Sequence, residues 1–302
     1  MAFTAKDVQA LRQRTGCGMM DCKKALESSD GDMEKSVEFL REKGLAAAAK
    51  KSGRIAAEGI VFASVDANTK VGVAVEVNSE TDFVAKNDGF VSFVKLVAET
   101  VQKQNPANVE VLQAMKPEGN AMTITELLQE KILTIGENLK VRRFSRMEGD
   151  LITYVHGGGR IGVMVKFDTD VAAKAGFVDY AKDIAMQIAA ANPLYLNKDA
   201  VPGGDIEEEK KILKAQAINE GKAENIAEKM VAGRISKFYK DTCLMDQEFV
   251  KDTELTITKY TEQKAKELGG SIKIVEFIRF EKGEGIQKKE DNFAEEVQSM
   301  IK

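Results

Sequence analysis

The order of apolar and polar residues predicts three short helices near the N-terminus. Val8 and Leu11 begin an apolar stripe directly after Thr4 and Asp7, which have the spacing of a helix-capping pair. The stripe breaks at residues 15–18, where two glycines occur. Helical spacing then resumes twice, on either side of a second glycine-containing turn at 30–32. The apolar positions of these later helices are Met20, Leu26, Met33, Val37 and Leu40.

Gly44 is the expected end of the third helix, because glycine is the usual residue at a helix C-terminus. The alanine-rich stretch LAAAAKKSGR at 45–54 follows as a helical connector, whose basic end is most simply a solvated face. Residues 1–55 are therefore expected to form an N-terminal three-helix module with its connector.

From residue 56 onward the sequence repeats itself. EGIVFASVDANTKVGVAVEV at 58–77 aligns with EGDLITYVHGGGRIGVMVKF at 148–167, so that Gly72 matches Gly162. Each copy predicts two antiparallel strands joined by a turn. A helix pattern follows in each copy, and both helices end at an Asn-Pro pair. The matching helix positions are Phe90, Phe93, Val97 and Val101 in the first copy and Phe177, Tyr180, Ile184 and Ile188 in the second.

The connection between strand and helix differs between the copies. TDFVAK at 81–86 is aligned with TDVAAK at 169–174, which makes Val171 the expected counterpart of Phe83. The first copy has three additional residues, placed by this alignment near Asn78–Glu80 and near Asn87. Phe83 stands in a polar connection, where burial is least assured, so it either folds into its own core or serves an interface.

These patterns predict an α+β fold with two related core subdomains, 56–145 and 146–282. Each is expected to hold a small antiparallel sheet covered on one face by helices, closed by a helix and a further strand. The second copy carries an insertion at 204–243 with two helical patterns poor in apolar residues. We expect a projecting antiparallel helical hairpin there, with a purely structural buttress as the alternative.

Composition excludes several classes of partner and compartment. Lys and Arg number 44 against 48 Asp and Glu, so direct nucleic-acid binding has no electrostatic support. No apolar stretch is long enough to span a membrane, and the N-terminus lacks the apolar core of a signal peptide. A cytoplasmic protein is therefore expected. Cys17, Cys22 and Cys243 are too sparse for a zinc site and are interpreted as plain thiols.

The sequence contains few residues or motifs that could support catalysis. His156 is the single histidine, and no nucleophile elbow accompanies it. The Gly157–Arg160 stretch precedes a strand pattern and not a helix, which favours a hairpin turn over a phosphate-binding loop. No GxxxxGK[ST] motif is present either. We expect no enzyme, no cofactor and no metal site.

Six segments, in order and over nearly the whole chain, closely resemble bacterial elongation factor Ts. Together they are highly specific, although any one of them would be weak. They are LRQRTGCGMMDCKKAL (11–26), EVNSETDFVAKNDGF (76–90), IGENLKVRR (135–143), HGGGRIGV (156–163), IAEKMVAGR (226–234) and EFIRFEKGEGI (276–286).

The resemblance implies a guanine nucleotide exchange factor that binds elongation factor Tu in its GDP-bound and nucleotide-free forms. The nucleotide and its magnesium would then belong to the partner. The family organisation adds a C-terminal helical module, expected at 283–302, to the modules predicted above. It also allows two complexes of this chain with elongation factor Tu to pair as a dimer of heterodimers, since the sequence does not determine the stoichiometry.

The resemblance also implies partner contacts. Thr81, Asp82, Phe83 and Val84 match the segment that dislocates the partner's magnesium, with Phe83 wedged between helices of its nucleotide domain. The other matching positions are Arg12, Met19, Met20, Ile135 and His156. His156 matches a residue facing the partner's third domain, although its glycine turn is one residue longer than the family pattern. By composition alone, the two methionines and Ile135 could equally be core residues.

Two rival functions belong to other classes. The N-terminal module resembles ubiquitin-associated helical bundles, so a peptide-binding adaptor with the core as scaffold is the first alternative. Main binding activity retained by residues 1–50 alone would favour it. The second alternative is an enzyme, which would require His156 for turnover of a small molecule.

Overall fold

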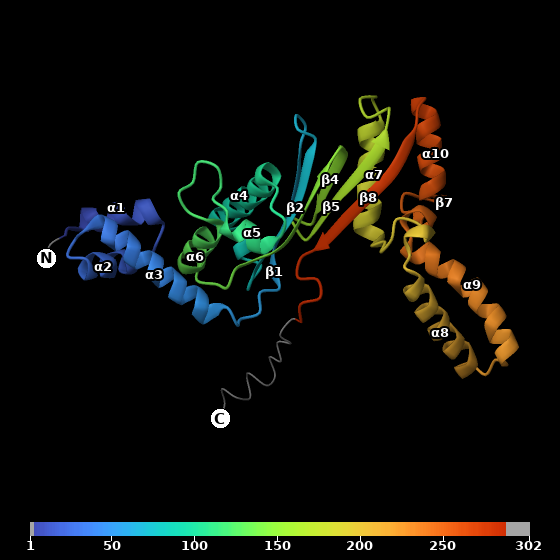
Figure 1. Cartoon of the computed structure of the whole chain (residues 1–302), viewed down its shortest axis with the longest axis horizontal. Coiled ribbons are helices and arrows are strands. Elements are labelled where there is room, and N and C mark those ends of the chain that lie inside the picture. The colour runs from blue at the N-terminus through green and yellow to red at the C-terminus, as the bar shows by residue number, and fades with distance from the viewer. Residues whose placement is uncertain (1–2, 288–302) are drawn as a thin grey trace.

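The computed structural model describes residues 3–287 and has an α+β fold with small antiparallel sheets, which confirms the predicted class (Figure 1). Residues 283–285 form a turn after the last strand. The C-terminal helical module expected at 283–302 otherwise lies outside the described residues. Within residues 3–287, no helix is long and apolar enough to cross a membrane.

Three helices form the N-terminal part, as the apolar pattern predicts. Thr4 and Asp7 make the expected capping box, and Leu11, Cys22 and Leu26 are fully buried between the helices. Gly16 ends the first helix in the left-handed region, at φ 67°. The helices are α1 (Ala5–Thr15), α2 (Met19–Ser28) and α3 (Met33–Lys51).

The expected helix end at Gly44 is wrong, since α3 continues through it to Lys51. Gly44 is buried against helix α6 (Ile124–Ile135), and a Cβ there would lie 3.4 Å from the backbone oxygen of Gln129. The glycine therefore allows two helices to approach closely and does not end a helix. Residues 45–51 of the alanine-rich connector are the last part of α3.

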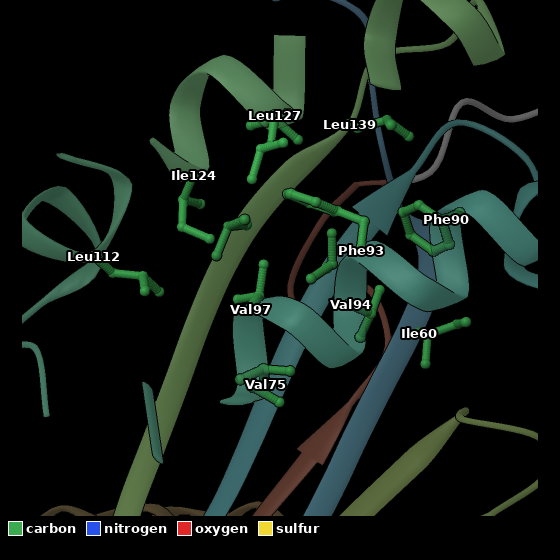
Figure 2. Close-up of a cluster of buried hydrophobic side chains, with 14 of the residues drawn as sticks. Ile60, Val75, Phe90, Phe93, Val94, Val97, Leu112, Ile124, Leu127 and Leu139 are labelled. Carbon is green, nitrogen blue, oxygen red and sulfur yellow. The ribbon is translucent and has the colours of Figure 1, made fainter. Parts of the chain in front are cut away.

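The first core copy is a three-stranded antiparallel sheet in the order β1-β2-β3, covered on one face by helices. Figure 2 shows side chains from α4 and the following helices packing on the strands, with Phe93, Val94 and Val97 at the centre and Phe90 at one side. The elements are β1 (Glu58–Asp66), β2 (Val71–Ser79), α4 (Asp88–Gln104), α5 (Val109–Ala114), α6 and β3 (Lys140–Glu148), with the short 3-10 helix η1 (Val84–Lys86) before α4.

The second copy repeats this plan in the order β4-β5-β8, with α7 and α10 packed on the sheet. A two-stranded ribbon, β6-β7, lies beside α10 and was not anticipated. The elements are β4 (Asp150–His156), β5 (Ile161–Thr169), α7 (Phe177–Ala191), η2 (Lys198–Ala200), η3 (Leu244–Asp246), β6 (Glu248–Phe249), β7 (Asp252–Thr256), α10 (Ile257–Leu268) and β8 (Ile272–Glu281).

The two copies correspond in detail. The central strands β2 and β5 are each nine residues long, and each carries a register shift at the equivalent place, Glu76/Val77 and Lys166/Phe167. The helices α4 and α7 both end at an asparagine in the left-handed region, Asn105 at φ 48° and Asn192 at φ 47°. The backbone thus follows the sequence repeat through strand, bulge and helix stop.

The two sheets pack face to face, which the sequence analysis did not anticipate. Gly72 on β2 faces Leu151 and Met164, and Gly162 on β5 faces Val61. A Cβ at either glycine would overlap these side chains, so the two glycines let the sheets approach closely. Both central strands are consequently buried along most of their length.

A buried carboxylate ties the sheets together at one end. Glu76 on β2 is fully buried and accepts hydrogen bonds from Arg142 Nη1 at 2.9 Å, Arg143 Nε at 2.6 Å and the backbone N–H of Gly283 at 2.8 Å. Burial acts to raise the pKa of Glu76, but these donors and the amide of Asn78 lower it below its ordinary value. The ionised carboxylate therefore joins β2, β3 and the turn after β8.

The insertion in the second copy forms two antiparallel helices, α8 (Gly203–Asn219) and α9 (Glu224–Thr242), that project from the body (Figure 1). Only Ala217, Ala227 and Ile235 are buried within these helices. Ion pairs link α9 to α8 and to the residue that follows α8, through Lys214 with Glu224 and Arg234 with Glu220.

Candidate functional site

The loop between β2 and α4 exposes a single large aromatic side chain. Phe83 is 78% exposed, although the next residue, Val84, is 6% exposed and belongs to the first core. Asp82 is exposed as well, and its side chain has no hydrogen bond to any residue in the described range 3–287. The alternative in which Phe83 covers its own subdomain is therefore wrong for the isolated chain.

Hydrogen bonds hold this loop against the segment before β3. The Glu137 carboxylate accepts the backbone N–H of Glu80 at 3.1 Å, the backbone N–H of Thr81 at 3.0 Å and the hydroxyl of Thr81 at 2.6 Å. In return, Glu80 Oε1 accepts the backbone N–H of Asn138 at 2.6 Å. The exposed Phe83 thus stands on a loop fixed on one side by these bonds and on the other by buried Val84.

The register of the two copies shows where the additional residues lie. The Glu80 carboxylate binds the N–H of Asn138 as the Asp170 carboxylate binds the N–H of Ser271, so Glu80 corresponds to Asp170. Counting back from the helices, Val84 corresponds to Val171, because the oxygen of each accepts a backbone N–H three residues later at 2.9 Å. Both valines are buried.

The expected count of three additional residues is confirmed, but their expected placement is wrong. Three residues, Thr81 to Phe83, separate Glu80 from Val84, whereas Asp170 and Val171 are adjacent. Val171 is therefore the counterpart of Val84 and not of Phe83. Phe83 belongs to a segment that the second copy lacks.

Phe83 borders an open depression that brings together two parts of the chain. Ile135, at the C-terminal end of α6, lies on the same depression and is partly buried against the first core. Gly16, in the turn between α1 and α2, also lines it, close to Thr134. The remaining lining residues are Val84, Asn87, Gly89, Glu130 and Lys131.

The N-terminal residues singled out by the sequence are on the surface. Met19 is 56% exposed and Met20 62% exposed, so their interpretation as core residues is wrong. Both begin α2, just after the turn that contains Gly16, and Arg12 lies exposed in the last turn of α1 before it. The turn at Gly16 therefore connects these three residues to the depression beside Phe83.

His156 is not part of this group. It is exposed at the end of β4 in the other sheet, where its Nδ1 lies 3.0 Å from the hydroxyl of Tyr154. The turn that follows contains Gly157, Gly158 and Gly159, all with positive φ, and connects β4 to β5 as the hairpin interpretation predicts. His156 therefore marks a second, separate surface.

Besides His156, the candidate reactive or metal-binding groups of the described residues include the cysteines and the acidic side chains. Cys17, Cys22 and Cys243 are buried, and burial raises the pKa of each thiol, as expected of plain thiols. Among residues 3–287, no three His, Cys, Asp or Glu side chains are grouped so that they could hold a metal ion.

Sequence reasoning missed the residues that hold the Phe83 loop. Glu80, Glu137 and Asn138 lie in segments that carry the family resemblance, but nothing in their spacing shows that they meet. The available signal was indirect. Glu80 directly follows β2 and Glu137 lies shortly before β3, and the end of one strand lies beside the start of the other because the two strands pair antiparallel.

Comparison with known proteins identifies the family. The model of the family described as elongation factor TS matches residues 80–284. Elongation factor Ts of Clostridium perfringens strain SM101 is 56% identical over 301 residues, which cover 99% of each chain. The proteins of the same name from Clostridium kluyveri and Clostridium novyi are 53% and 51% identical, over 99% of this chain and 99% and 98% of theirs. The chain belongs to the elongation factor Ts family.

Proposed function

We propose that the protein is a translation elongation factor that promotes exchange of GDP for GTP on elongation factor Tu. It binds the GDP form of that partner, displaces the magnesium ion and stabilises the nucleotide-free state. The observation that carries this proposal is Phe83, an aromatic side chain 78% exposed on a loop that hydrogen bonds hold in place. Family membership supports the identity of the partner.

The mechanism follows from linkage between two ligands of one partner. If the protein binds elongation factor Tu more tightly when GDP is absent, its binding must weaken GDP by the same factor. The difference in affinity comes from contacts that only the nucleotide-free conformation allows. The protein therefore needs no bond-making residues, and its surface carries the whole function.

Phe83 supplies such a contact. An exposed aromatic side chain is a typical interface anchor, because it buries a large area when it enters a pocket and loses little conformational freedom. We propose that it enters between helices of the partner's nucleotide domain, with Asp82 beside it at the rim and Thr81 and Val84 shaping the loop. Moving the partner's magnesium ligands removes a large favourable electrostatic interaction with the nucleotide phosphates.

The other exposed residues extend the interface. Arg12, Met19 and Met20 lie next to the turn that lines the Phe83 depression, which supports contact with the same nucleotide domain. Ile135 lines the depression itself. His156 lies on the second sheet, which supports its assignment to a different domain of the partner.

The remaining proposals concern the division of the chain into units, its cellular compartment and the stoichiometry of its complexes. We propose the units 1–55, 56–145 and 146–282, with the hairpin 204–243 as a peripheral arm and 283–302 as a C-terminal module. The protein acts in the cytoplasm without contacting nucleic acid or membrane, and its complexes with elongation factor Tu can pair into a dimer of heterodimers.

The direct test uses elongation factor Tu loaded with a fluorescent GDP derivative. Addition of catalytic amounts of the protein with excess unlabelled nucleotide should accelerate loss of the signal. The same protein without elongation factor Tu should show no stoichiometric GDP site in calorimetry. Unchanged release at saturating concentrations, or a GDP site in the isolated chain, would contradict the proposal.

A further inference from the structure

Glu137 has no equivalent side chain in the second copy of the core. In the bulged register, Val77 pairs with Val141 in the first copy, and Phe167 pairs with Ile274 in the second. Four residues before Val141 (141 − 4) is Glu137, and four before Ile274 (274 − 4) is Gly270. The first copy therefore has a carboxylate where the second has no side chain.

In the second copy, side chains of the neighbouring loop occupy the space where a side chain at Gly270 would lie. A Cβ at Gly270 would collide with Cγ1 of Val171 and Oδ1 of Asp170. Val171 is 1% exposed and packs in the second core directly after Asp170. Without a side chain at 270, Val171 turns inward into the second core, and the short loop exposes no large apolar side chain, since its exposed residues include Asp170, Ala173 and Lys174.

In the first copy the carboxylate holds the longer loop away from that position. Its two oxygens accept three hydrogen bonds, all from Glu80 and Thr81, at 2.6–3.1 Å. Thr81 is the first of the three residues that the second copy lacks, and Phe83 is the last. Hydrogen bonds to an ionised acceptor are stronger than neutral ones, so this contact fixes the start of the inserted segment.

We propose that Glu137 is the positioning residue that keeps Phe83 presented to the partner. The inference rests on the proposed function, because it concerns how the contact residue is held in place. An exposed phenylalanine on a free loop would spend much of its time collapsed on nearby apolar surface, such as the side chain of Ile135. Holding the loop in its binding conformation before the encounter reduces the cost of association.

The test is a double-mutant cycle on GDP release. Removing the carboxylate with Glu137→Ala should lower the catalysed rate at subsaturating protein roughly tenfold, as expected if the loop then spends about a tenth of its time in the competent conformation. In a Phe83→Ala background the same substitution should change the rate less than about twofold, because residues that act through one another are not additive. Glu137→Gln, which keeps the size and one acceptor oxygen, should give an intermediate loss.

A second readout does not depend on exchange. The chain has no tryptophan, so Phe83→Trp introduces a single fluorescent reporter into the loop. Adding Glu137→Ala to that variant should lower the steady-state anisotropy of the introduced indole as the loop gains motion. Glu148→Ala, which removes one negative charge at the other end of β3, is the matched control and should change neither anisotropy nor exchange.

Three results would decide against the inference. Glu137 does not act through Phe83 if the Glu137→Ala variant promotes GDP release at the normal rate. The same follows if the fold-reduction in rate of the double variant equals the product of the reductions of the two single variants. Unchanged anisotropy would show that the loop is held without it. If Phe83→Ala itself exchanges normally, the proposed function fails, and the anisotropy alone then decides whether Glu137 fixes the loop. Circular dichroism of each variant establishes that it is folded.

Discussion

Phe83→Ala should change the free energy of unfolding little but should strongly reduce the rate of GDP release from elongation factor Tu. Removing a buried phenylalanine typically costs about 3–5 kcal/mol. Phe83 is 78% exposed, so only 100 − 78 = 22% of the side chain is covered, and scaling the cost by this fraction gives about 1 kcal/mol or less for Phe83→Ala. For a unit of roughly 60–100 residues, such as 56–145, 1 kcal/mol corresponds to a shift in Tm of about 4–8 °C, so the shift should be at most that large.

The effect on exchange should be much larger. Loss of an aromatic interface anchor costs on the order of 2 kcal/mol or more, which is roughly thirtyfold if it appears wholly in the transition state for GDP release. Thermal unfolding followed by circular dichroism and release of fluorescent GDP from elongation factor Tu measure the two quantities on the same samples.

Phe90→Ala is the matched control, because Phe90 is fully buried in the first core a few residues away. It should lose about 3–5 kcal/mol of stability while its folded fraction still supports exchange. The reasoning is refuted if Phe83→Ala unfolds as early as Phe90→Ala and its folded fraction exchanges GDP at the normal rate.

Further predictions test the architecture and the interface. Replacing 204–243 with a short Gly/Ser linker should leave cooperative unfolding intact and weaken exchange only in part, whereas a broad melt would show that the arm belongs to the core. Glu76→Ala should cost about 1–3 kcal/mol at neutral pH, because it leaves the buried backbone N–H of Gly283 without this acceptor and removes the carboxylate shared by half-buried Arg142 and Arg143. The folded-state pKa of Glu76 lies below 4.5, so its stabilisation is present above that pH, and the difference in stability between wild type and Glu76→Gln should shrink as the pH falls through the lowered pKa. Gly162→Ala should destabilise by about 1–3 kcal/mol through its clash with Val61, and equal urea midpoints would argue against tight packing of the sheets. Met20→Ala should change stability by less than about 0.5 kcal/mol but weaken the complex severalfold in titration calorimetry.

The elements that the sequence predicts well are those set by local chemistry. The strands of both copies follow from alternating apolar residues, and the helix stops at Asn105 and Asn192 follow from the proline after each. The α+β class follows from these elements and their repetition. The exposed position of Phe83 was left open, because a polar flanking sequence does not fix the direction of one side chain.

The features that the sequence did not predict depend on long-range contacts. Gly44 has the local character of a helix end, yet its function is decided by helix α6, more than eighty residues later. The face-to-face packing of the sheets depends on Gly72 and Gly162 meeting side chains of the other copy. The hydrogen bonds between Glu137 and the Phe83 loop likewise join residues 56 and 57 positions apart, which no local pattern encodes.

The most direct test of the account is the magnesium dependence of GDP release. Release from elongation factor Tu is measured by stopped-flow fluorescence at saturating wild-type protein and at saturating Phe83→Ala, with magnesium present and with magnesium removed by a chelator. If Phe83 acts by displacing the ion, GDP release in the presence of magnesium should be roughly thirtyfold faster with the wild-type protein than with Phe83→Ala. Without magnesium, the ratio of these two rates should fall towards one. An equal advantage in both conditions would contradict magnesium displacement by Phe83.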